Sequence, residues 1–244
     1  MSDESERALE RWNRVAGAYS MSREHGALSL SAIYEPAIEE PLGDVFGKRL
    51  LEAGCGDGSY ACKLATRGAS VTAVDGSPEM IRIAVRGTER GDIEYRLADL
   101  TKPLELPDQQ FDIVLANMVL MDILRIDVAI AEFARVLRRG GLFVFSLTHP
   151  CFFCSDWIYD EHGTKLHKAV ADYLSTKVEA LDFWGTTLHF HRPLSQYFGD
   201  VTRHGFVIDA LLEPMPSEEA AAQHPDWQHH RRIPSFIVIR AVRS

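Results

Sequence analysis

Short apolar stretches alternate with helix-like segments between Lys48 and Leu147, and few architectures accommodate such a pattern. The strand-like stretches are KRLLEA, SVTAVD, IEYRLAD, FDIVLAN and LFVFSLT, and the helix-like segments among them include SYACKLATRG, SPEMIRIAVRG and DVAIAEFARVLRRGG. Strands joined through helices run parallel, and the helices then cover both faces of the sheet. The sequence therefore predicts an α/β fold.

Local signals indicate where the helices begin and end. Ser77 and Pro78 suit the N-cap and the first helical position of SPEMIRIAVRG, and Gly87 suits its end. The preceding helix is expected to end at Gly68, where a left-handed residue fits. Apolar residues fall on one face of the segment 127–141, which predicts a further helix over that whole range.

The remaining chain is expected to complete a single domain, 1–244, around a cofactor-binding core at 48–149. Residues 1–45 have helical patterning and are expected to form a cap over the carboxyl edge of the sheet. Residues 150–191 are rich in aromatic side chains and break the alternation, so we expect a substrate-lid insertion there. Residues 192–244 resume with a helix and two strands close together in sequence, which predicts an antiparallel finish to the sheet.

Composition narrows the classes of partner. The 244 residues include 46% hydrophobic residues, without an apolar stretch near the roughly 18 residues that span a bilayer. The polar, charged N-terminal sequence favours a cytoplasmic protein, and a net charge of −9 disfavours a nucleic-acid partner. A small molecule is therefore the expected partner, with no membrane or nucleic acid. The sequence leaves a homodimer open.

The turn after the first strand, EAGCGDGS, indicates which kind of ligand the sheet binds. Ligands of open α/β sheets lie at the carboxyl ends of the strands, and Gly54, Gly56 and Gly58 let a ligand approach the backbone there. A dinucleotide fingerprint needs its third glycine at position 59, which is Ser59, and the chain has no G-x-x-x-x-G-K-[ST] phosphate loop. The spacing therefore disfavours both ligands.

Carboxylates around this turn indicate a cationic ligand. Glu52 and Asp57 flank the turn, where they would repel phosphate and attract positive charge. Asp75, at the end of the second strand and 19 residues past Gly56, is placed to accept the hydroxyls of a ribose. Asp99, after the third strand, is placed to reach an adenine amino group. A positively charged adenosine without phosphate describes S-adenosylmethionine.

These features together resemble the class I S-adenosylmethionine-dependent methyltransferases, and among them the small-molecule branch. The resemblance rests on E-A-G-C-G-D-G, Asp75, A-D-L at 98–100, FDIVLANMVL and VLRRGGLFVFS. It implies a Rossmann-like, seven-stranded, mostly parallel sheet with an antiparallel last strand inserted beside the sixth. The loop NMVLMD lacks the N-P-P-[YF] signature of methyltransferases that act on nucleic-acid amino groups, which again disfavours a nucleic-acid substrate.

The resemblance also implies which residues contact the cofactor. The N-terminal segment W-[DN]-x-x-A-x-x-Y supplies a tyrosine that closes over it, and the ends of four strands supply the rest. The residues implied are Tyr19, Glu52, Gly54, Cys55, Gly56, Gly58, Asp75, Gly76, Ser77, Met80, Asp99, Leu100, Asn117, Met118 and Val119.

Candidate catalytic and substrate residues lie after the fifth strand. His149 and His191 are candidates for a general base, because an imidazole titrates near neutrality, and both are also candidates for substrate contact, with Tyr197. The alternative is that they only shape the pocket. Trp184 belongs to an aromatic cluster that would form either a substrate pocket or ordinary core. The lone C-x-x-C at 151–154 lacks a second pair of ligands, so no metal is predicted.

The function predicted is in-line transfer of a methyl group from S-adenosylmethionine to a small-molecule acceptor. The alternatives are an RNA or protein methyltransferase, an NAD-dependent oxidoreductase and a non-catalytic S-adenosylmethionine-binding regulator. The sequence does not identify the acceptor, the atom methylated or the oligomeric state, nor does it establish that a general base is used.

Overall fold

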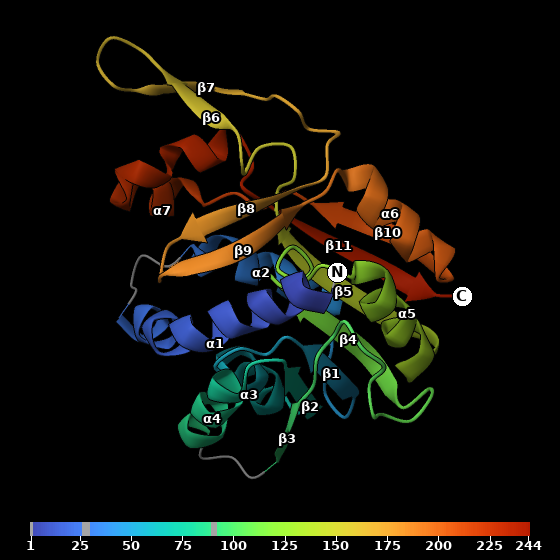
Figure 1. Ribbon diagram of the computed structural model, residues 1–244. Helices are drawn as coiled ribbons and strands as arrows, with labels where there is room; N and C mark the ends of the chain where they lie inside the picture. The colour runs from blue at the N-terminus through green and yellow to red at the C-terminus, as the bar shows by residue number, and fades with distance from the viewer. Residues whose placement is uncertain (1, 26–29, 89–91) are drawn as a thin grey trace.

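Five adjacent parallel strands form one side of a seven-stranded sheet in the computed structural model, which describes residues 2–25, 30–88 and 92–244 (Figure 1). The strand order is β10-β11-β5-β4-β1-β2-β3. The parallel strands are β1 (Arg49–Ala53), β2 (Ser70–Asp75), β3 (Ile93–Leu97), β4 (Phe111–Asn117) and β5 (Leu137–Thr148). Residues 1 and 26–29 of the predicted N-terminal cap lie outside the described residues.

One strand near the edge of the sheet breaks the parallel pattern, and the edge strand beyond it runs in the direction of the other five. β11 (Phe236–Arg243) pairs antiparallel with both β5 and β10 (Phe206–Leu212). The last strand of the chain therefore lies between the fifth and sixth strands of the sheet. This arrangement confirms the predicted antiparallel finish and the predicted seven-stranded, Rossmann-like fold.

Helices cover both faces of the sheet because the strand residues alternate between two apolar clusters. On β4, Val114 and Ala116 pack in the cluster that contains Phe133, whereas Ile113 and Leu115 pack in the opposite cluster. The first cluster includes side chains of α5 and α6, and the second includes side chains of α2 and α3. The helices are α1 (Ser2–His25), α2 (Ser31–Leu42), α3 (Ser59–Thr66), α4 (Pro78–Gly87), α5 (Ile126–Val136), α6 (Leu194–Arg203), α7 (Glu218–Gln223) and the 3₁₀ helix η1 (Pro225–Arg231).

The helix ends follow the local sequence signals in two places. The side chain of Ser77 accepts a hydrogen bond from the backbone N–H of Met80, and Pro78 begins α4, which ends at Gly87. Gly68 lies just beyond α3 with φ at 88°, in the left-handed region that suits glycine. Both predictions are confirmed.

The helix predicted over 127–141 is wrong at its C-terminal end. α5 ends at Val136, and Leu137 is already extended, with φ −73° and ψ 142°. Leu137 pairs with Phe111 of β4, so the residues from Leu137 onward belong to a strand although their sequence pattern is helical. Gly140 then adopts φ 71°, and the register shifts between Phe111 and Ile113. Tertiary pairing outweighs local helical periodicity here.

Residues 150–191 form two hairpins outside the main sheet. One pairs β6 (Asp156–Tyr159) with β7 (Lys165–Ala169), and the other pairs β8 (Lys177–Asp182) with β9 (Thr186–His191). The β6–β7 hairpin extends away from the body of the molecule, whereas α1 lies between the β8–β9 hairpin and the helices α3 and α4 (Figure 1). No helix within the described residues is long and apolar enough to cross a membrane.

A buried imidazole on β9 makes stability depend on pH. Burial is the main cause that lowers the pKa of His189, from 6.5 to about 4, although Glu179 opposes the shift. Below pH 6.5 the unfolded chain takes up a proton that the folded chain binds only near pH 4, so the free energy of unfolding falls as pH drops between these values. Replacing the ring by an apolar one, as in His189→Phe, removes part of this fall.

Thermal denaturation between pH 7 and pH 4 measures the effect. We expect His189→Phe to lose less stability than wild type over this range. His162→Phe is the matched control, because the His162 side chain is 79% exposed, and it should follow the wild-type curve. Equal pH dependence of wild type and His189→Phe would contradict the prediction.

Candidate functional site

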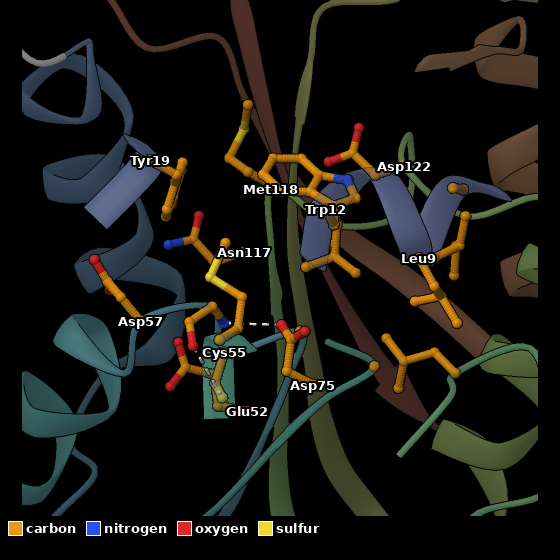
Figure 2. A pocket seen from close by; sticks show the side chains of 18 of the residues that line it. Leu9, Trp12, Tyr19, Glu52, Cys55, Asp57, Asp75, Asn117, Met118 and Asp122 are labelled. Atoms are coloured by element: carbon orange, nitrogen blue, oxygen red, sulfur yellow. Dashed lines mark hydrogen bonds between the residues drawn. The ribbon is translucent and has the colours of Figure 1, made fainter. Parts of the chain in front are cut away.

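A cavity lies where the carboxyl ends of β1, β2, β3 and β4 meet α1 (Figure 2). It encloses about 950 Å³ when its open mouth is included, within the range of sites for cofactors and small ligands. Thirteen residues of the predicted cofactor set line it: Tyr19, Glu52, Gly54, Cys55, Gly56, Asp75, Gly76, Met80, Asp99, Leu100, Asn117, Met118 and Val119. Their contact with a cofactor stays a prediction, but the fold gathers them at one place.

The glycine turn is held by strand β2 and by the loop after β4. The backbone N–H groups of Gly54 and Cys55 donate to the carbonyl oxygen of Val74 at 2.7 and 2.9 Å. Gly54 has φ 75°, and a Cβ added there would lie 2.4 Å from a methyl carbon of Val119. Glycine is therefore required at position 54 both by conformation and by the approach of Val119.

Two residues of the predicted cofactor set, Gly58 and Ser77, lie behind the cavity lining. A Cβ at Gly58 would meet the hydroxyl of Tyr95 at 2.6 Å, so this glycine permits packing between helix and strand. Ser77 is fully buried, and its hydroxyl donates to the Asn13 Oδ1 at 3.0 Å while it caps α4. Both residues therefore support the turn and the helix from behind.

Backbone N–H groups fix the carboxylate of Asp75 at the end of β2. Oδ2 accepts from the Gly56 N–H at 2.9 Å, and Oδ1 accepts from the Ser77 N–H at 2.8 Å. Burial raises the pKa of Asp75, and these hydrogen bonds oppose the rise. Each carboxylate oxygen keeps a further lone pair, so the side chain can accept two hydroxyl groups from a ligand.

Glu52 is a buried acid without a hydrogen-bond partner for one of its oxygens. Glu52 is only 2% exposed, and its Oε2 accepts no hydrogen bond from any described residue. Burial, and then the negative charge of Asp57, raises the pKa of Glu52 well above its usual value, whereas Arg23 opposes the rise. A buried acceptor without a donor is unfavourable unless a ligand supplies one.

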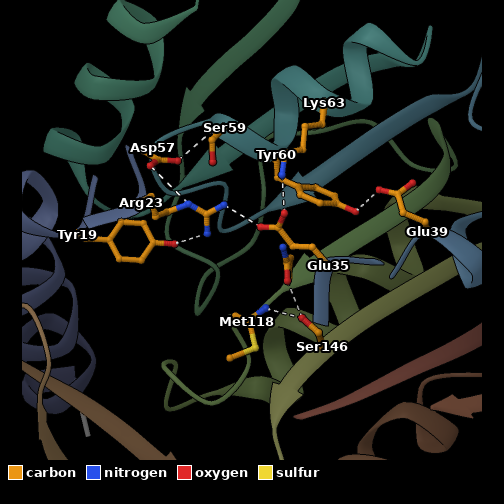
Figure 3. A network of polar contacts seen from close by, with 11 residues as sticks. Tyr19, Arg23, Glu35, Glu39, Asp57, Ser59, Tyr60, Lys63, Met118 and Ser146 are labelled. Atoms are coloured by element: carbon orange, nitrogen blue, oxygen red, sulfur yellow. Dashed lines mark hydrogen bonds and ion pairs between the residues drawn. The ribbon is translucent and has the colours of Figure 1, made fainter. Parts of the chain in front are cut away.

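Arg23 ties the N-terminal cap to the glycine turn (Figure 3). Its guanidinium donates to Glu35 of α2 at 2.8 Å and to the hydroxyl of Tyr19 at 3.3 Å, and its Nε lies 3.8 Å from a carboxylate oxygen of Asp57. Lys63 of α3 pairs with the other oxygen of Glu35. One guanidinium thus connects α1, α2 and the turn before α3.

The loop after β4 enters the cavity with a backbone conformation that is unusual for its residue. Met118 has φ 58°, and its N–H donates to the hydroxyl of Ser146 at 2.9 Å. The same hydroxyl donates to the Oδ1 of Asn117 at 2.7 Å. Such left-handed residues persist only where the surroundings determine them, and they concentrate at binding sites.

Asp99 lines the cavity but already has partners. Its Oδ1 accepts from the N–H and the hydroxyl of Thr101 at 2.9 and 2.7 Å, and its Oδ2 lies 3.1 Å from the ammonium of Lys102. Burial acts to raise its pKa, but these contacts hold the pKa of Asp99 below its usual value. The carboxylate therefore fixes the turn after β3 and still faces the cavity.

The predicted catalytic histidines lie away from the cavity lining. The Nε2 of His149 donates to Glu213 at 3.0 Å while its Nδ1 accepts from the Cys151 N–H, and burial lowers its pKa. The Nε2 of His191 donates to the carbonyl oxygen of Tyr173 at 3.0 Å. Neither residue is among those that line the cavity. Both side chains therefore have protein partners, and their catalytic roles stay predictions.

The two other predicted substrate residues also lie outside the lining. Tyr197 is 1% exposed, and burial raises its pKa to about 12. Trp184, in the turn between β8 and β9, packs on Tyr19 and Trp12, with ring centroids 4.9 and 6.0 Å away. No residue of 150–191 lines the cavity. The insertion instead contacts α1, whose residues do line it.

Sequence reasoning missed several residues of this site. Trp12, Arg23 and Asp122 line the cavity, and Asn13 joins α1 to α4 by accepting from the Glu79 N–H at 2.9 Å. The helical spacing of Trp12, Tyr19 and Arg23 was a signal, because positions four and seven apart share a helix face. Asp122 has no motif of its own.

Comparison with known proteins agrees with this geometry. Residues 51–145 match a family model described as a methyltransferase domain. The chain is 34% identical over 141 residues to a demethylmenaquinone methyltransferase of Tropheryma whipplei, covering 57% of this chain and 58% of the relative. It is 33% identical over 138 residues to a malonyl-[acyl-carrier protein] O-methyltransferase of Serratia marcescens, covering 55% and 53%. The chain thus spans less than two thirds of the length of these relatives.

A solved structure extends the match to most of the chain. An S-adenosylmethionine-dependent methyltransferase from Mesorhizobium loti superimposes with a TM-score of 0.78 at 27% identity, covering 86% of this chain and 97% of that one. The fold is therefore that of S-adenosylmethionine-dependent methyltransferases. The cavity of this methyltransferase fold occupies the carboxyl edge of the sheet, where ligands of open α/β sheets lie.

The contact between Gly54 and Val119 leads to a prediction on stability. Gly54→Ala adds left-handed strain and forces Val119 to move, so we expect it to lower the free energy of unfolding by about 2–4 kcal/mol. Gly47→Ala is the matched control, since Gly47 has φ 68° and nothing lies within 4 Å of an added Cβ. Its loss should be about 1–2 kcal/mol, from strain alone.

Urea denaturation of the two variants and wild type measures the difference. Equal losses in the two variants would show that Val119 yields freely and that only backbone conformation requires glycine at position 54.

Proposed function

We propose that this protein transfers a methyl group from S-adenosylmethionine to a small-molecule acceptor bound beneath α1. The observation that carries the proposal is the set of carboxyl groups at the glycine turn, above all the unpartnered, buried oxygen of Glu52. Glu52, Asp57 and Asp75 line the cavity, whereas Arg23 is the only cationic side chain among the described residues that line it. The excess of acids suits a cationic ligand, and S-adenosylmethionine carries a sulfonium and an ammonium group.

The residues present fit this cofactor. Gly54 and Gly56 would lie along its methionine part, and the unpartnered oxygen of Glu52 would take a donor from the ligand. Asp75 would accept the ribose hydroxyls, because two backbone N–H groups already orient its carboxylate. Met80 and Asp99 would lie against the adenine. Tyr19 would close the site from α1, where its hydroxyl is bonded to Arg23.

The protein's contribution to the reaction is to bind, orient and exclude water. S-adenosylmethionine, when bound, supplies a methyl group on a positively charged sulfur, which is reactive toward a nucleophile aligned with the carbon–sulfur bond. The protein then has to hold the acceptor in line with that bond. The left-handed Met118 and the packing of Trp184 on Tyr19 and Trp12 restrict the chamber in which the acceptor would lie.

An acceptor with an apolar body fits the cavity. Leu9, Trp12 and Ile123 line it together with the polar groups of the glycine turn. One relative of this chain is named for demethylmenaquinone, which supports a small-molecule acceptor. The net charge of −9 argues against a nucleic-acid substrate. Location in the cytoplasm and assembly as a homodimer stay predictions.

Thermal-shift measurements with S-adenosylmethionine, S-adenosylhomocysteine and NAD test the proposal. We expect both sulfur ligands to raise the melting temperature and NAD to have no effect. Asp75→Ala should abolish the shift, because it removes the acceptor for the ribose hydroxyls. Asp108→Ala, on a side chain 72% exposed, is the control and should keep it. Stabilisation by NAD alone would overturn the proposed function, and an unchanged shift in Asp75→Ala would refute the role of Asp75.

A further inference from the structure

The buried guanidinium of Arg192 holds the loop that follows β4. Arg192 is 2% exposed and donates to the carbonyl oxygens of Leu120, Phe190, Ile123 and Leu124 at distances between 2.6 and 3.2 Å. Three of these carbonyls belong to the loop. Arg192 therefore fixes the loop backbone, and a side chain carried by this loop is held in place before any ligand arrives.

Asp122 is the acidic side chain that this loop presents to the cavity. It lines the cavity, and Figure 2 shows its carboxyl group directed into the pocket, on the side away from Glu52 and Asp75. Its backbone N–H donates to the carbonyl oxygen of Val119 at 2.8 Å, which closes the turn. No hydrogen bond joins its carboxyl group to any part of the chain that the structure describes.

The surroundings of Asp122 make an unpartnered carboxyl group unfavourable. Leu9, Trp12, Met118 and Ile123 line the same cavity and offer mainly apolar surface. Burial raises the pKa of Asp122 well above its usual value, although the charge of Arg192 opposes the rise. A polar group held without a partner in such surroundings is typical of a binding site, where the ligand completes the hydrogen bonding.

We propose, on the basis of the methyl-transfer function proposed above, that Asp122 binds the O–H or N–H of the acceptor's nucleophile and takes up its proton. A lone pair on the acceptor's oxygen or nitrogen forms the bond to the methyl carbon, and the electron pair of the broken O–H or N–H bond stays on that atom. The sulfur keeps the pair of the broken carbon–sulfur bond, and a carboxylate oxygen of Asp122 receives the proton. Charge and atoms balance, and no further reactant is needed.

The proposal defines a class of acceptor. The molecule carries a hydroxyl or an amine on an apolar body, with the polar group toward Asp122 and the body against Trp12 and Ile123. A carboxylate acceptor does not fit, because an ionised Asp122 repels it. Unlike His149 and His191, Asp122 faces the cavity and has no protein partner that would have to be displaced.

Binding of four probes to the protein saturated with S-adenosylhomocysteine tests the proposal without knowledge of the natural acceptor. The probes are benzyl alcohol, benzylamine, toluene and benzoate, measured by saturation-transfer NMR. We expect the alcohol and the amine to bind more tightly than toluene and benzoate. Asp122→Leu should weaken the alcohol and the amine by about tenfold or more and leave toluene unchanged or tighter, which also shows that the variant is folded.

The affinity for benzylamine measured over a range of pH adds a second readout, because a loss of packing would not change its pH dependence. Benzylamine should bind wild type more tightly as pH rises through the raised pKa of Asp122, because the carboxyl group then ionises while the amine is still charged. Asp122→Asn should reduce this pH dependence to the part that Glu52 and Asp75 contribute, because these acids line the same cavity and their pKa values are also raised. Asp127→Asn, at a carboxylate 46% exposed and paired with Arg125, is the matched control and should keep it.

The outcomes separate this proposal from the proposed function. Calorimetry of S-adenosylhomocysteine alone tests the cofactor site, and failure to bind wild type would overturn the proposed function. If that ligand binds, the role of Asp122 is overturned when the alcohol and amine bind no better than toluene, when Asp122→Leu leaves their affinity unchanged, or when benzoate binds best.

Discussion

The parallel register of three strands determines the position of nearly every group in the site. β1 pairs with β2 on one side and with β4 on the other, so Glu52, Asp75 and Asn117 reach the same edge of the sheet. The turn after β1 therefore lies beside the end of β2, where the carbonyl oxygen of Val74 accepts hydrogen bonds from its backbone. The acids that surround the turn follow from this register, since each lies at or just beyond the end of its strand.

A second set of contacts brings the N-terminal helix over that edge. Asn13 accepts hydrogen bonds at the start of α4, and Arg23 joins α1 to α2 and to the glycine turn. The β8–β9 hairpin packs on the other side of α1 through Trp184. The cap is therefore fixed by polar contacts toward the sheet and by aromatic contacts toward the hairpin, and Trp12 and Tyr19 line the cavity as well as contacting Trp184.

The fold was readable from the sequence because its signals are local. Strand and helix periodicity, the N-cap at Ser77 and the left-handed Gly68 each depend on a few neighbouring residues. The end of α5 was not readable, because pairing of Leu137 with β4 competes with helical periodicity and is a long-range contact. The glycine turn and its acids were found by spacing, whereas Asp122 was not. Its position depends on Arg192, which is distant in sequence and whose partners are backbone carbonyls that no motif records.

The contact between α1 and the end of β2 also links the side chains at two positions that are distant in sequence. A Cβ at Gly76 would lie 2.4 Å from a methyl carbon of Leu9, although the backbone at Gly76 does not itself require glycine. A larger residue at 76 therefore requires the end of the Leu9 side chain to move, and a smaller residue at 9 would remove that requirement. In a chimera that joins this sheet to the first helix of another protein with this fold, the residue in place of Leu9 therefore decides how large a side chain position 76 can accommodate.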